Sequence, residues 1–423
     1  MPAWKHLIND KAAADRSLLL RYFPVFAQLG FDVPVGLADL EVCSLGEGAR
    51  LVPVGPVSGV RISVCDETSA MATGTYKDLD ACLTVAMARA NGIQRLVLSS
   101  GGNLGYALAR YASRIGLEVF VFQPATTLYK LDGASYGDSH VRLITVDLPE
   151  RSVKALAQAF ADHYTILCAP SLQWRLAASA VRAMFIVEHA VGRQMKIDYL
   201  AQTMCAGFGP VGIYECFAAL TANQLMPPFA VPRFLGFQQD ANCPMVRAWR
   251  DGSRDIRPQH IDAHPEKYLE PGLYNTDPGE SYTRLFELMN DFGGDLESLS
   301  DRDYEHYAPQ VVELLDRAGI ELTRLDHGEL IEKTGVLTGV GILKAIDTGR
   351  IRCGESVLFL LTGGRRMRTA NSRPVEPFVE VDRSRSIDEW VVEIGERCGL
   401  VAPDRHEPIA HVTVPGVVSD KLG

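Results

Sequence analysis

An alternation of short apolar strands with amphipathic helices constrains the fold of this chain more than any other feature. Strands are predicted at residues 96–98, 119–122, 141–146 and 165–168, and helical patterns lie between them. Strands that alternate with helices pair in parallel, and the helices cover both faces of the sheet. The alternation therefore predicts an α/β fold with a doubly wound sheet.

A second series of the same kind follows a long predicted helix at residues 176–191. Its strands are predicted near residues 199–206, 234–238 and 357–361. A chain of 423 residues is too long for one compact core, so we expect two domains. Ligands of doubly wound sheets bind beyond the carboxyl ends of the strands, so the turns found there are the first candidates for a functional site.

Two stretches depart from this pattern. Between Asp251 and Tyr304 the chain is polar and carries four prolines, and we expect a long excursion or a lid there. After Met367 the alternation ends, which predicts a C-terminal extension with one helix near residues 387–398.

The composition narrows the class of protein. A formal net charge of −10 argues against nucleic acid or an acidic membrane surface as the main partner. No apolar run approaches the roughly 20 residues that span a bilayer, and the charged N-terminal residues do not resemble a signal peptide. Nine cysteines without metal-ligand spacing indicate reduced thiols and no metal site. We therefore expect a cytoplasmic enzyme that acts on a small molecule.

A glycine-rich turn follows the strand predicted near residues 199–206 and precedes a helix. Backbone N–H groups at such a helix N-terminus bind phosphate. The spacing also fits a dinucleotide motif, but Asp240 lies too far along the chain to contact the ribose. A tight turn without a ligand is the simpler alternative. The residues of the turn are Gly207, Phe208, Gly209, Pro210, Val211 and Gly212.

Three further segments place polar groups at the ends of predicted strands. The small residues of Ser99–Asn103 let the backbone approach a flat ring or a carboxylate. Thr362 follows the last strand, where its hydroxyl can hydrogen-bond a ring nitrogen. Arg175 carries a planar guanidinium that matches carboxylate and phosphate groups. Taken singly, each is more often an ordinary turn, a common strand end or a solvated charge than a functional group.

Lys77 opens a predicted helix that runs to about Asn91. It directly follows Thr73-Gly74-Thr75-Tyr76, in which the hydroxyl groups can cap the helix. A lysine at a helix start, taken alone, is more often a solvated charge of the first turn than a functional group.

Taken together and in this order, the segments resemble the pyridoxal phosphate (PLP) enzymes of fold type II, the tryptophan synthase β-subunit fold. Within that fold they are most similar to the threonine synthase group, over about residues 20–367. Thr73–Asp78 resembles the group's Thr-Gly-Ser-Phe-Lys-Asp, and Ser100–Asn103 its Ser-Thr-Gly-Asn. The other matching segments are Ser44–Gly48, the glycine turn and Thr362-Gly363.

The resemblance implies a domain arrangement. It implies two three-layer doubly wound domains with the cofactor in the cleft between them, in a homodimer. Residues 1–90 and 180–370 would form the large PLP-binding domain, and residues 91–179 a small mobile α/β domain. Residues 371–423 would form the extension.

The resemblance also implies roles for the site residues. Lys77 would hold PLP as a Schiff base and act as the base at Cα of the substrate. Asn103 would meet the phenolic oxygen of the cofactor, and Thr362 its pyridine nitrogen. The glycine turn, Gly207 to Gly212, would hold the cofactor phosphate. The substrate, an anionic amino acid, would contact Thr73, Ser100, Gly101, Gly102, Lys130 and Arg175.

Several residues depart from the threonine synthase pattern. Met71-Ala72 stands where the group has Asn-Pro, Ala169 replaces an Asn, and the glycine turn contains Pro210. Cysteate synthase, a relative that replaces the phosphate of phosphoserine with sulfite, departs in the same neighbourhood. The departures indicate that the cofactor site is retained while the substrate pocket is altered.

The predicted activity is β- or γ-replacement on an O-phospho or O-acyl amino acid, such as O-phosphoserine or O-phosphohomoserine. The alternative within the same chemistry is an elimination of the serine or threonine dehydratase kind, in which an ammonia-lyase needs no second substrate. A non-catalytic amino-acid sensor and a nucleotide-binding protein are the alternatives from other classes, and both leave the Lys77, Asn103 and Thr362 segments without a common purpose.

Overall fold

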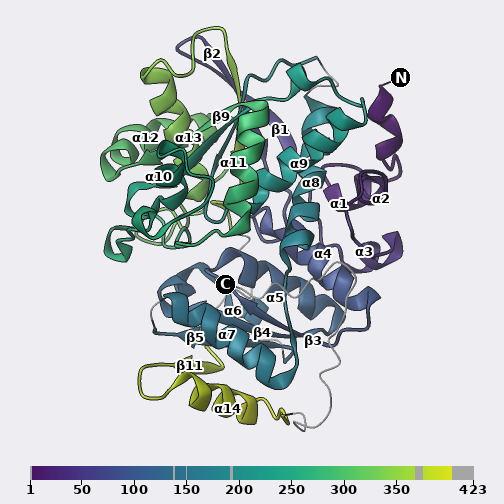
Figure 1. Cartoon of the computed structure of the whole chain (residues 1–423), viewed down its shortest axis with the longest axis vertical. Coiled ribbons are helices and arrows are strands. Elements are labelled where there is room, and N and C mark those ends of the chain that lie inside the picture. The colour runs from purple at the N-terminus through teal and green to yellow at the C-terminus, as the bar shows by residue number, and fades with distance from the viewer. Residues whose placement is uncertain (1, 137–138, 149, 191–193, 367–374, 403–423) are drawn as a thin grey trace. The chain divides into compact units, whose positions relative to one another are not determined.

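The computed structural model describes residues 2–136, 139–148, 150–190, 194–366 and 375–402. The chain divides into two compact units, which are described separately (Figure 1). Unit 1 comprises Met1–Phe31, Gly46–Tyr76 and Arg175–Met367. Unit 2 comprises Asp32–Leu45, Lys77–Trp174 and Arg368–Gly423.

Unit 1 is built on a six-stranded sheet with the order β1-β2-β10-β7-β8-β9. The first two strands pair antiparallel, and all the remaining pairs in the sheet are parallel. Every residue of β7 and β10 is buried and most of them are apolar, as expected when helices cover both faces. The strands are β1 (Arg50–Val57), β2 (Val60–Asp66), β7 (Tyr199–Thr203), β8 (Arg233–Gln239), β9 (Gly294–Leu299) and β10 (Ser356–Leu361).

The helices of unit 1 accompany this sheet, and α8 begins with the last residues of unit 2. They are α1 (Leu18–Arg21), α2 (Pro24–Gln28), α8 (Leu172–His189), α9 (Phe208–Ala222), α10 (Pro244–Arg250), α11 (Glu280–Phe292), α12 (Asp301–Arg317) and α13 (Thr334–Asp347). Short 3-10 turns lie at η1 (Ala3–Leu7), η4 (Pro228–Ala230), η5 (Asp240–Asn242), η6 (Pro258–His260) and η7 (Pro265–Lys267).

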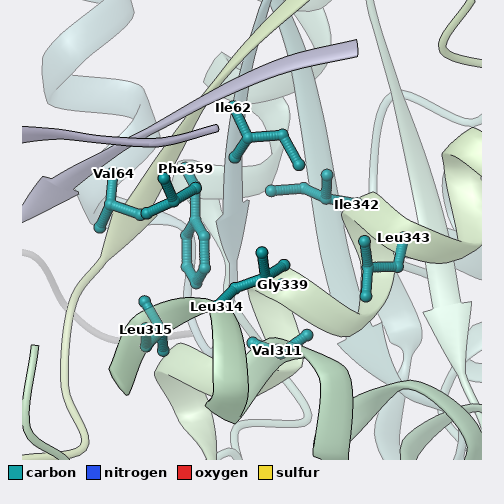
Figure 2. Close-up of a pocket in the computed structure, with 10 residues that line it drawn as sticks. Ile62, Val64, Val311, Leu314, Leu315, Gly339, Ile342, Leu343 and Phe359 are labelled. Carbon is teal, nitrogen blue, oxygen red and sulfur yellow. The ribbon is translucent and has the colours of Figure 1, made fainter. Parts of the chain in front are cut away.

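An apolar cluster of unit 1 packs α12 and α13 against strands β2, β7, β8 and β10. Glycines in α13 permit the close approach, because a Cβ on Gly339 would lie 2.4 Å from Cγ1 of Val311. Figure 2 shows Val311, Gly339 and Phe359 around a small cavity of about 10 Å³. All the residues that line it are apolar and its volume is about that of one water, so it is a packing void and not a ligand site.

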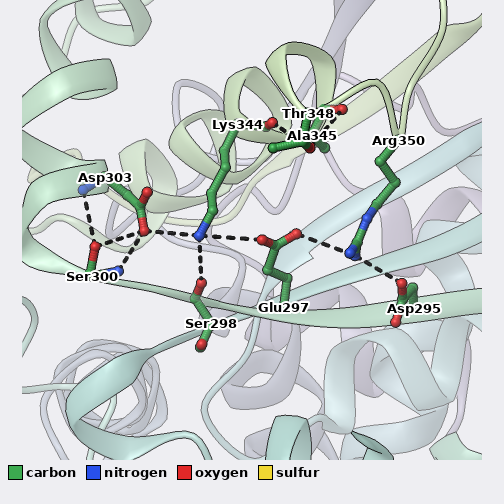
Figure 3. Close-up of polar contacts among 9 residues, drawn as sticks. All are labelled: Asp295, Glu297, Ser298, Ser300, Asp303, Lys344, Ala345, Thr348 and Arg350. Atoms are coloured by element: carbon green, nitrogen blue, oxygen red, sulfur yellow. Dashed lines mark hydrogen bonds and ion pairs between the residues drawn. The ribbon is translucent and has the colours of Figure 1, made fainter.

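A polar network joins α12, α13 and β9 at the edge of unit 1 (Figure 3). The ammonium group of Lys344 on α13 lies 2.9 Å from a carboxylate oxygen of Asp303 and 3.2 Å from one of Glu297. Arg350 bridges Glu297 and Asp295. Asp303 also accepts a hydrogen bond from the N–H of Ser300, and so completes a capping box at the start of α12.

Unit 2 contains a five-stranded parallel sheet with the order β11-β5-β4-β3-β6. The strands are β3 (Arg95–Ser99), β4 (Glu118–Pro124), β5 (Val141–Val146), β6 (Leu167–Cys168) and β11 (Val379–Val381). The helical elements are α3 (Leu37–Cys43), α4 (Lys77–Ala90), α5 (Asn103–Ile115), η2 (Ala125–Lys130), α6 (Gly133–Tyr136), α7 (Glu150–Tyr164) and α14 (Ile387–Arg397). An apolar cluster packs α7 and α14 against β3, β4, β5 and β11.

The structure confirms the α/β fold with parallel sheets, and each predicted strand of the two series is present. The helices predicted from Lys77 and from residue 176 are α4 and α8. Near the N-terminus α1 and α2 are separate helices, because Pro24 begins a new helix. No helix among the described residues combines the length and the apolar character that a membrane crossing requires.

Two stretches are more regular than the sequence pattern indicates. The stretch at 251–304 contains the helix α11 and the edge strand β9, in addition to loop residues. In the described residues 375–402, the predicted helix near residues 387–398 is present as α14, and β11 pairs in parallel with β5. The units also differ from the domain bounds expected from the sequence, since α4 groups with unit 2.

The ionisation of the Asp303 carboxylate predicts how the stability of the folded protein depends on pH. Burial opposes its ionisation, but hydrogen bonds from Ser300 and the ammonium of Lys344 outweigh burial and hold the pKa of Asp303 below its ordinary value. A lowered folded-state pKa contributes stability above the ordinary value of 3.8, and this stability is lost as the pH falls through the folded-state value.

We therefore expect Asp303→Asn to lower the free energy of unfolding by about 1–2 kcal/mol at pH 7. The difference from the unmodified chain should shrink as the pH falls below 3.8. Urea unfolding at a series of pH values measures the loss of unfolding free energy and its dependence on pH. Asp301→Asn, at an exposed residue of the same turn, is the control and should change stability less. A loss from Asp303→Asn that is the same at all pH values would contradict the assignment.

Candidate active site

The loop that leads to Lys77 is hydrogen-bonded to the end of β10. The N–H of Glu67 donates to the carbonyl of Leu361 at 3.1 Å, and the N–H of Tyr76 donates to the carbonyl of Thr362 at 3.2 Å. Both ends of the loop at 67–76 are therefore fixed to the residues that close this strand. Lys77 follows Tyr76 directly in the chain, so the backbone position from which it starts is set by Thr362.

Gly74 gives this loop its close contact with the chain beyond β10. Its φ of +78° lies in the left-handed region that favours glycine. A Cβ at this position would also lie 2.4 Å from the carbonyl oxygen of Arg365. Both observations require glycine here, which explains the Thr-Gly-Thr sequence before Lys77. Thr73 and Thr75 are buried.

Lys77 is the first residue of α4 in unit 2. Its Nζ forms an ion pair with Asp80, one turn along, at 3.0 Å. The lysine side chain is 14% exposed and that of Asp80 is 2% exposed. The amine is thus held beside a carboxylate in a mostly buried setting.

The turn at Ser100–Asn103, also in unit 2, is organised by the hydroxyl of Ser100. Its Oγ accepts hydrogen bonds from the N–H groups of Gly102 at 3.1 Å and Gly105 at 2.8 Å. Gly102 has a φ of +136°, and Asn103 begins α5. Lys130 is buried and its Cδ lies 3.8 Å from where a Cβ on Gly102 would be. The structure therefore brings the predicted residues Ser100, Gly101, Gly102, Asn103 and Lys130 together.

The glycine turn lies in unit 1 at the start of α9. Gly207 is the N-cap with a φ of +79°, and no side chain of the described residues caps this helix end. The N–H of Val211 donates to the carbonyl of Gly207, and Pro210 has no N–H. The N–H groups of Phe208 and Gly209, in the first turn, have no partner within the helix. Such a terminus is suited to an anion.

Gly212 has a different role from the glycines that precede it. A Cβ at this position would lie 2.3 Å from the carbonyl oxygen of Leu176 on α8. Gly212 therefore lets α8 and α9 pack closely and does not itself offer a binding group. The close packing brings the arginines of α8 to the glycine turn: the Arg175 guanidinium carbon lies 3.8 Å from the centre of the Phe208 ring.

A second arginine of α8, Arg182, was missed in the sequence. Its Nε and Nη2 donate to the two carboxylate oxygens of Glu67 at 2.5 and 2.6 Å, and Nη2 also donates to Gln202 at 3.0 Å. The ring of Tyr76 stacks on the guanidinium, with its centre 4.5 Å away. Burial disfavours the charge, but the Glu67 carboxylate outweighs burial and raises the pKa of Arg182. The signal in the sequence is a single charge within the apolar run at 176–187.

The predicted residues are divided between the two units. Lys77, Ser100–Asn103 and Lys130 belong to unit 2, whereas Thr73, Arg175, Gly207–Gly212 and Thr362 belong to unit 1. Thr362 is buried directly after β10. Among the described residues, no group of three or more His, Cys, Asp or Glu side chains is arranged to hold a metal ion.

Comparison with known proteins gives a family and distant relatives. A family model described as pyridoxal-phosphate dependent enzyme matches residues 47–363. The chain is similar to cysteate synthase from Methanosarcina barkeri (strain Fusaro / DSM 804), with 24% identity over 309 residues that cover 69% of this chain and 68% of that protein. It is similar to threonine synthase from Methanosarcina acetivorans, with 24% identity over 295 residues, 69% of this chain and 67% of that protein.

Solved structures share the fold at lower identity. Diaminopropionate ammonia lyase from Escherichia coli superposes with a TM-score of 0.61 at 14% identity, covering 84% of this chain and 92% of that chain. The processed form of threonine deaminase isoform 2 from Solanum lycopersicum superposes with a TM-score of 0.55 at 12% identity, covering 88% of this chain and 93% of that chain. These likenesses support the fold.

The constraints on Gly74 in the loop before Lys77 predict the effect of a substitution on stability. We expect Gly74→Ala to destabilise the chain by about 1–3 kcal/mol, because the new Cβ meets the carbonyl of Arg365 and the backbone is left-handed. Urea unfolding measures the loss. Ala72→Gly, in the same loop but without either constraint, is the control and should cost about 1 kcal/mol or less. Equal effects of the two substitutions would contradict the account of Gly74.

Proposed function

Since the chain belongs to the family of pyridoxal-phosphate dependent enzymes, we propose that it replaces the phosphate of an O-phospho amino acid with an external nucleophile. The observation that carries the proposal is the similarity to cysteate and threonine synthases over about two thirds of the chain. O-Phosphoserine and O-phosphohomoserine are the proposed substrates, and O-acyl amino acids are the next candidates. Of the two, the altered residues Met71, Ala72 and Ala169 favour O-phosphoserine, because O-phosphohomoserine is the substrate of threonine synthase.

PLP is the cofactor of this family, and the residues present fit it. Among the described residues no side chain caps the start of α9, and its first backbone N–H groups have no partner within the helix, which suits a phosphate. Lys77 is the residue proposed to bind the aldehyde carbon. Asn103 and Thr362 are proposed to bind the ring, and Gly207, Phe208, Gly209, Pro210, Val211 and Gly212 the phosphate.

When bound, PLP supplies an electron sink for the bond that breaks at Cα. The residues of the chain supply binding and proton transfer. Nζ of Lys77 takes the proton from Cα of the substrate, for which it must first leave Asp80. The turn at Ser100–Asn103 binds the substrate carboxylate. The Thr362 hydroxyl hydrogen-bonds the ring nitrogen without adding a charge there.

The anionic end of the substrate needs cations, and two are proposed. Lys130 is buried beside Gly102, in the turn that binds the carboxylate. Arg175 lies over Phe208 at the start of α9. Their positive charges hold the leaving phosphate and stabilise the charge that develops on it as the bond breaks.

We further propose that the enzyme is a cytoplasmic homodimer. None of the nine cysteines, all of which lie in the described part of the chain, forms a disulfide, as expected of a reducing compartment. The dimer follows from the resemblance to fold type II enzymes. Size-exclusion chromatography with light scattering measures the mass directly.

Covalent labelling tests the assignment of Lys77. Purified protein treated with PLP and then with borohydride should carry the label on the peptide that contains Lys77. Lys77→Ala should lose the label, whereas Lys267→Ala, at an exposed lysine of η7, should keep it. A label that survives in Lys77→Ala would move the cofactor to another residue.

A substrate screen tests the reaction. We expect O-phosphoserine or O-phosphohomoserine to release phosphate only when sulfite, a thiol or an amine is also present. O-Acetylserine, serine and threonine serve as comparison substrates. Release of a 2-oxo acid and ammonia without a nucleophile would identify the alternative, an elimination. No release from any phospho amino acid would overturn the proposal.

A further inference from the structure

We propose that Arg182 is a phosphate-binding residue, whose Nη1 hydrogen-bonds the cofactor phosphate at the N-terminus of α9. The proposal rests on the proposed function, because it takes the start of α9 as the phosphate site of PLP. It adds a side chain to a site that otherwise consists of backbone groups. It also gives a purpose to a buried charge that the proposed mechanism does not use.

The hydrogen bonds of Arg182 use two of the three guanidinium nitrogens. Nε and Nη2 are occupied by Glu67 and Gln202. Nη1 is buried and has no hydrogen-bond partner among the described residues. The arginine side chain is 1% exposed, so bulk water does not satisfy its two N–H donors. A buried donor without a partner costs free energy, and a ligand oxygen would remove that cost.

The unsatisfied nitrogen faces the first turn of α9. A Cβ on Gly209 would lie 2.7 Å from Nη1 of Arg182 and 2.9 Å from Nε2 of Gln202. Any side chain at residue 209 would therefore cover Nη1. Glycine keeps it uncovered beside the same backbone N–H groups that the helix leaves unpaired. Two independent features, the uncapped helix end and the unpaired guanidinium nitrogen, thus meet at one residue.

The charges around Arg182 favour a phosphate over a neutral ligand. Glu67 neutralises the guanidinium and would repel an anion, but it holds only the Nε and Nη2 edge. Nη1 is the edge that remains for the phosphate. The helix N-terminus and Arg175, two turns earlier on α8 and over Phe208, add positive potential near the turn.

A comparison of two aldehydes isolates the phosphate contact. Pyridoxal has the ring and the aldehyde of PLP but no phosphate, so the ratio of their dissociation constants measures phosphate recognition. We propose to titrate the cofactor-free full chain with each aldehyde and follow the visible absorbance of the lysine adduct. Arg182→Met is combined with Glu67→Gln, so that no charge is left buried and unpaired.

We expect the dissociation constant of pyridoxal, divided by that of PLP, to be at least about tenfold smaller in the double variant than in the unmodified chain. Pyridoxal itself should bind about equally to both. Glu67→Gln alone retains Nη1 and removes the carboxylate that repels an anion, so the ratio should not fall. If Arg182 only supports the fold, both aldehydes weaken together, the ratio stays the same, and the proposal is overturned.

Two further measurements keep the test decisive. If the double variant does not fold, Arg182→Lys is used, because one ammonium group cannot serve Glu67 and the phosphate together and the ratio should again fall. Inorganic phosphate should raise the melting temperature of the cofactor-free unmodified chain more than that of the variant. Failure of both aldehydes to form an adduct with the unmodified chain would instead overturn the proposed function.

Discussion

The buried ion pair between Arg182 and Glu67 is the interaction on which the rest of the site depends. It ties α8 to the loop after β2, and through Gln202 to β7. Removing one partner of such a pair typically costs about 3–5 kcal/mol, because the other charge stays buried. The ring of Tyr76 rests on the same guanidinium. The pair therefore fixes the residue from which Lys77 continues, and at the same time presents Nη1 to the start of α9.

Local patterns explain why most of the fold was predictable. The strands of both series are apolar runs bounded by turns, and Lys77 and Asn103 each begin a helix after small residues. Two of the edge strands, β9 and β11, were not predictable in this way. β9 has the sequence Gly-Asp-Leu-Glu-Ser-Leu, which is polar enough to be taken as loop, and it becomes a strand because β8 pairs with it. β11 likewise has three residues and depends on β5.

The candidate site, like the fold, contains some residues that nearby sequence predicts and others that depend on partners far away in the chain. The positions of the glycine turn and of the turn at Ser100 could be predicted, because small residues between a strand and a helix mark both of them in the sequence. Arg182 could not, because its carboxylate partner lies 115 residues earlier in the sequence. Gly209 was predicted as a phosphate-loop residue, but its close approach to Arg182 appears only in three dimensions. Long-range pairs of this kind leave a lone charge in an apolar helix as their only mark on the sequence.

The ion pair between Lys77 and Asp80 has a consequence for the life of the protein before it acquires its cofactor. Nζ of Lys77 lies against the Asp80 carboxylate, so an aldehyde that reaches this amine has to displace the carboxylate before it can react. If Lys77 binds the cofactor as proposed, an aldehyde that binds only weakly would leave before the pair opens. One that is also held by its phosphate would remain long enough to react. Selectivity for the correct aldehyde would then come from residence time and not from the reactivity of the lysine.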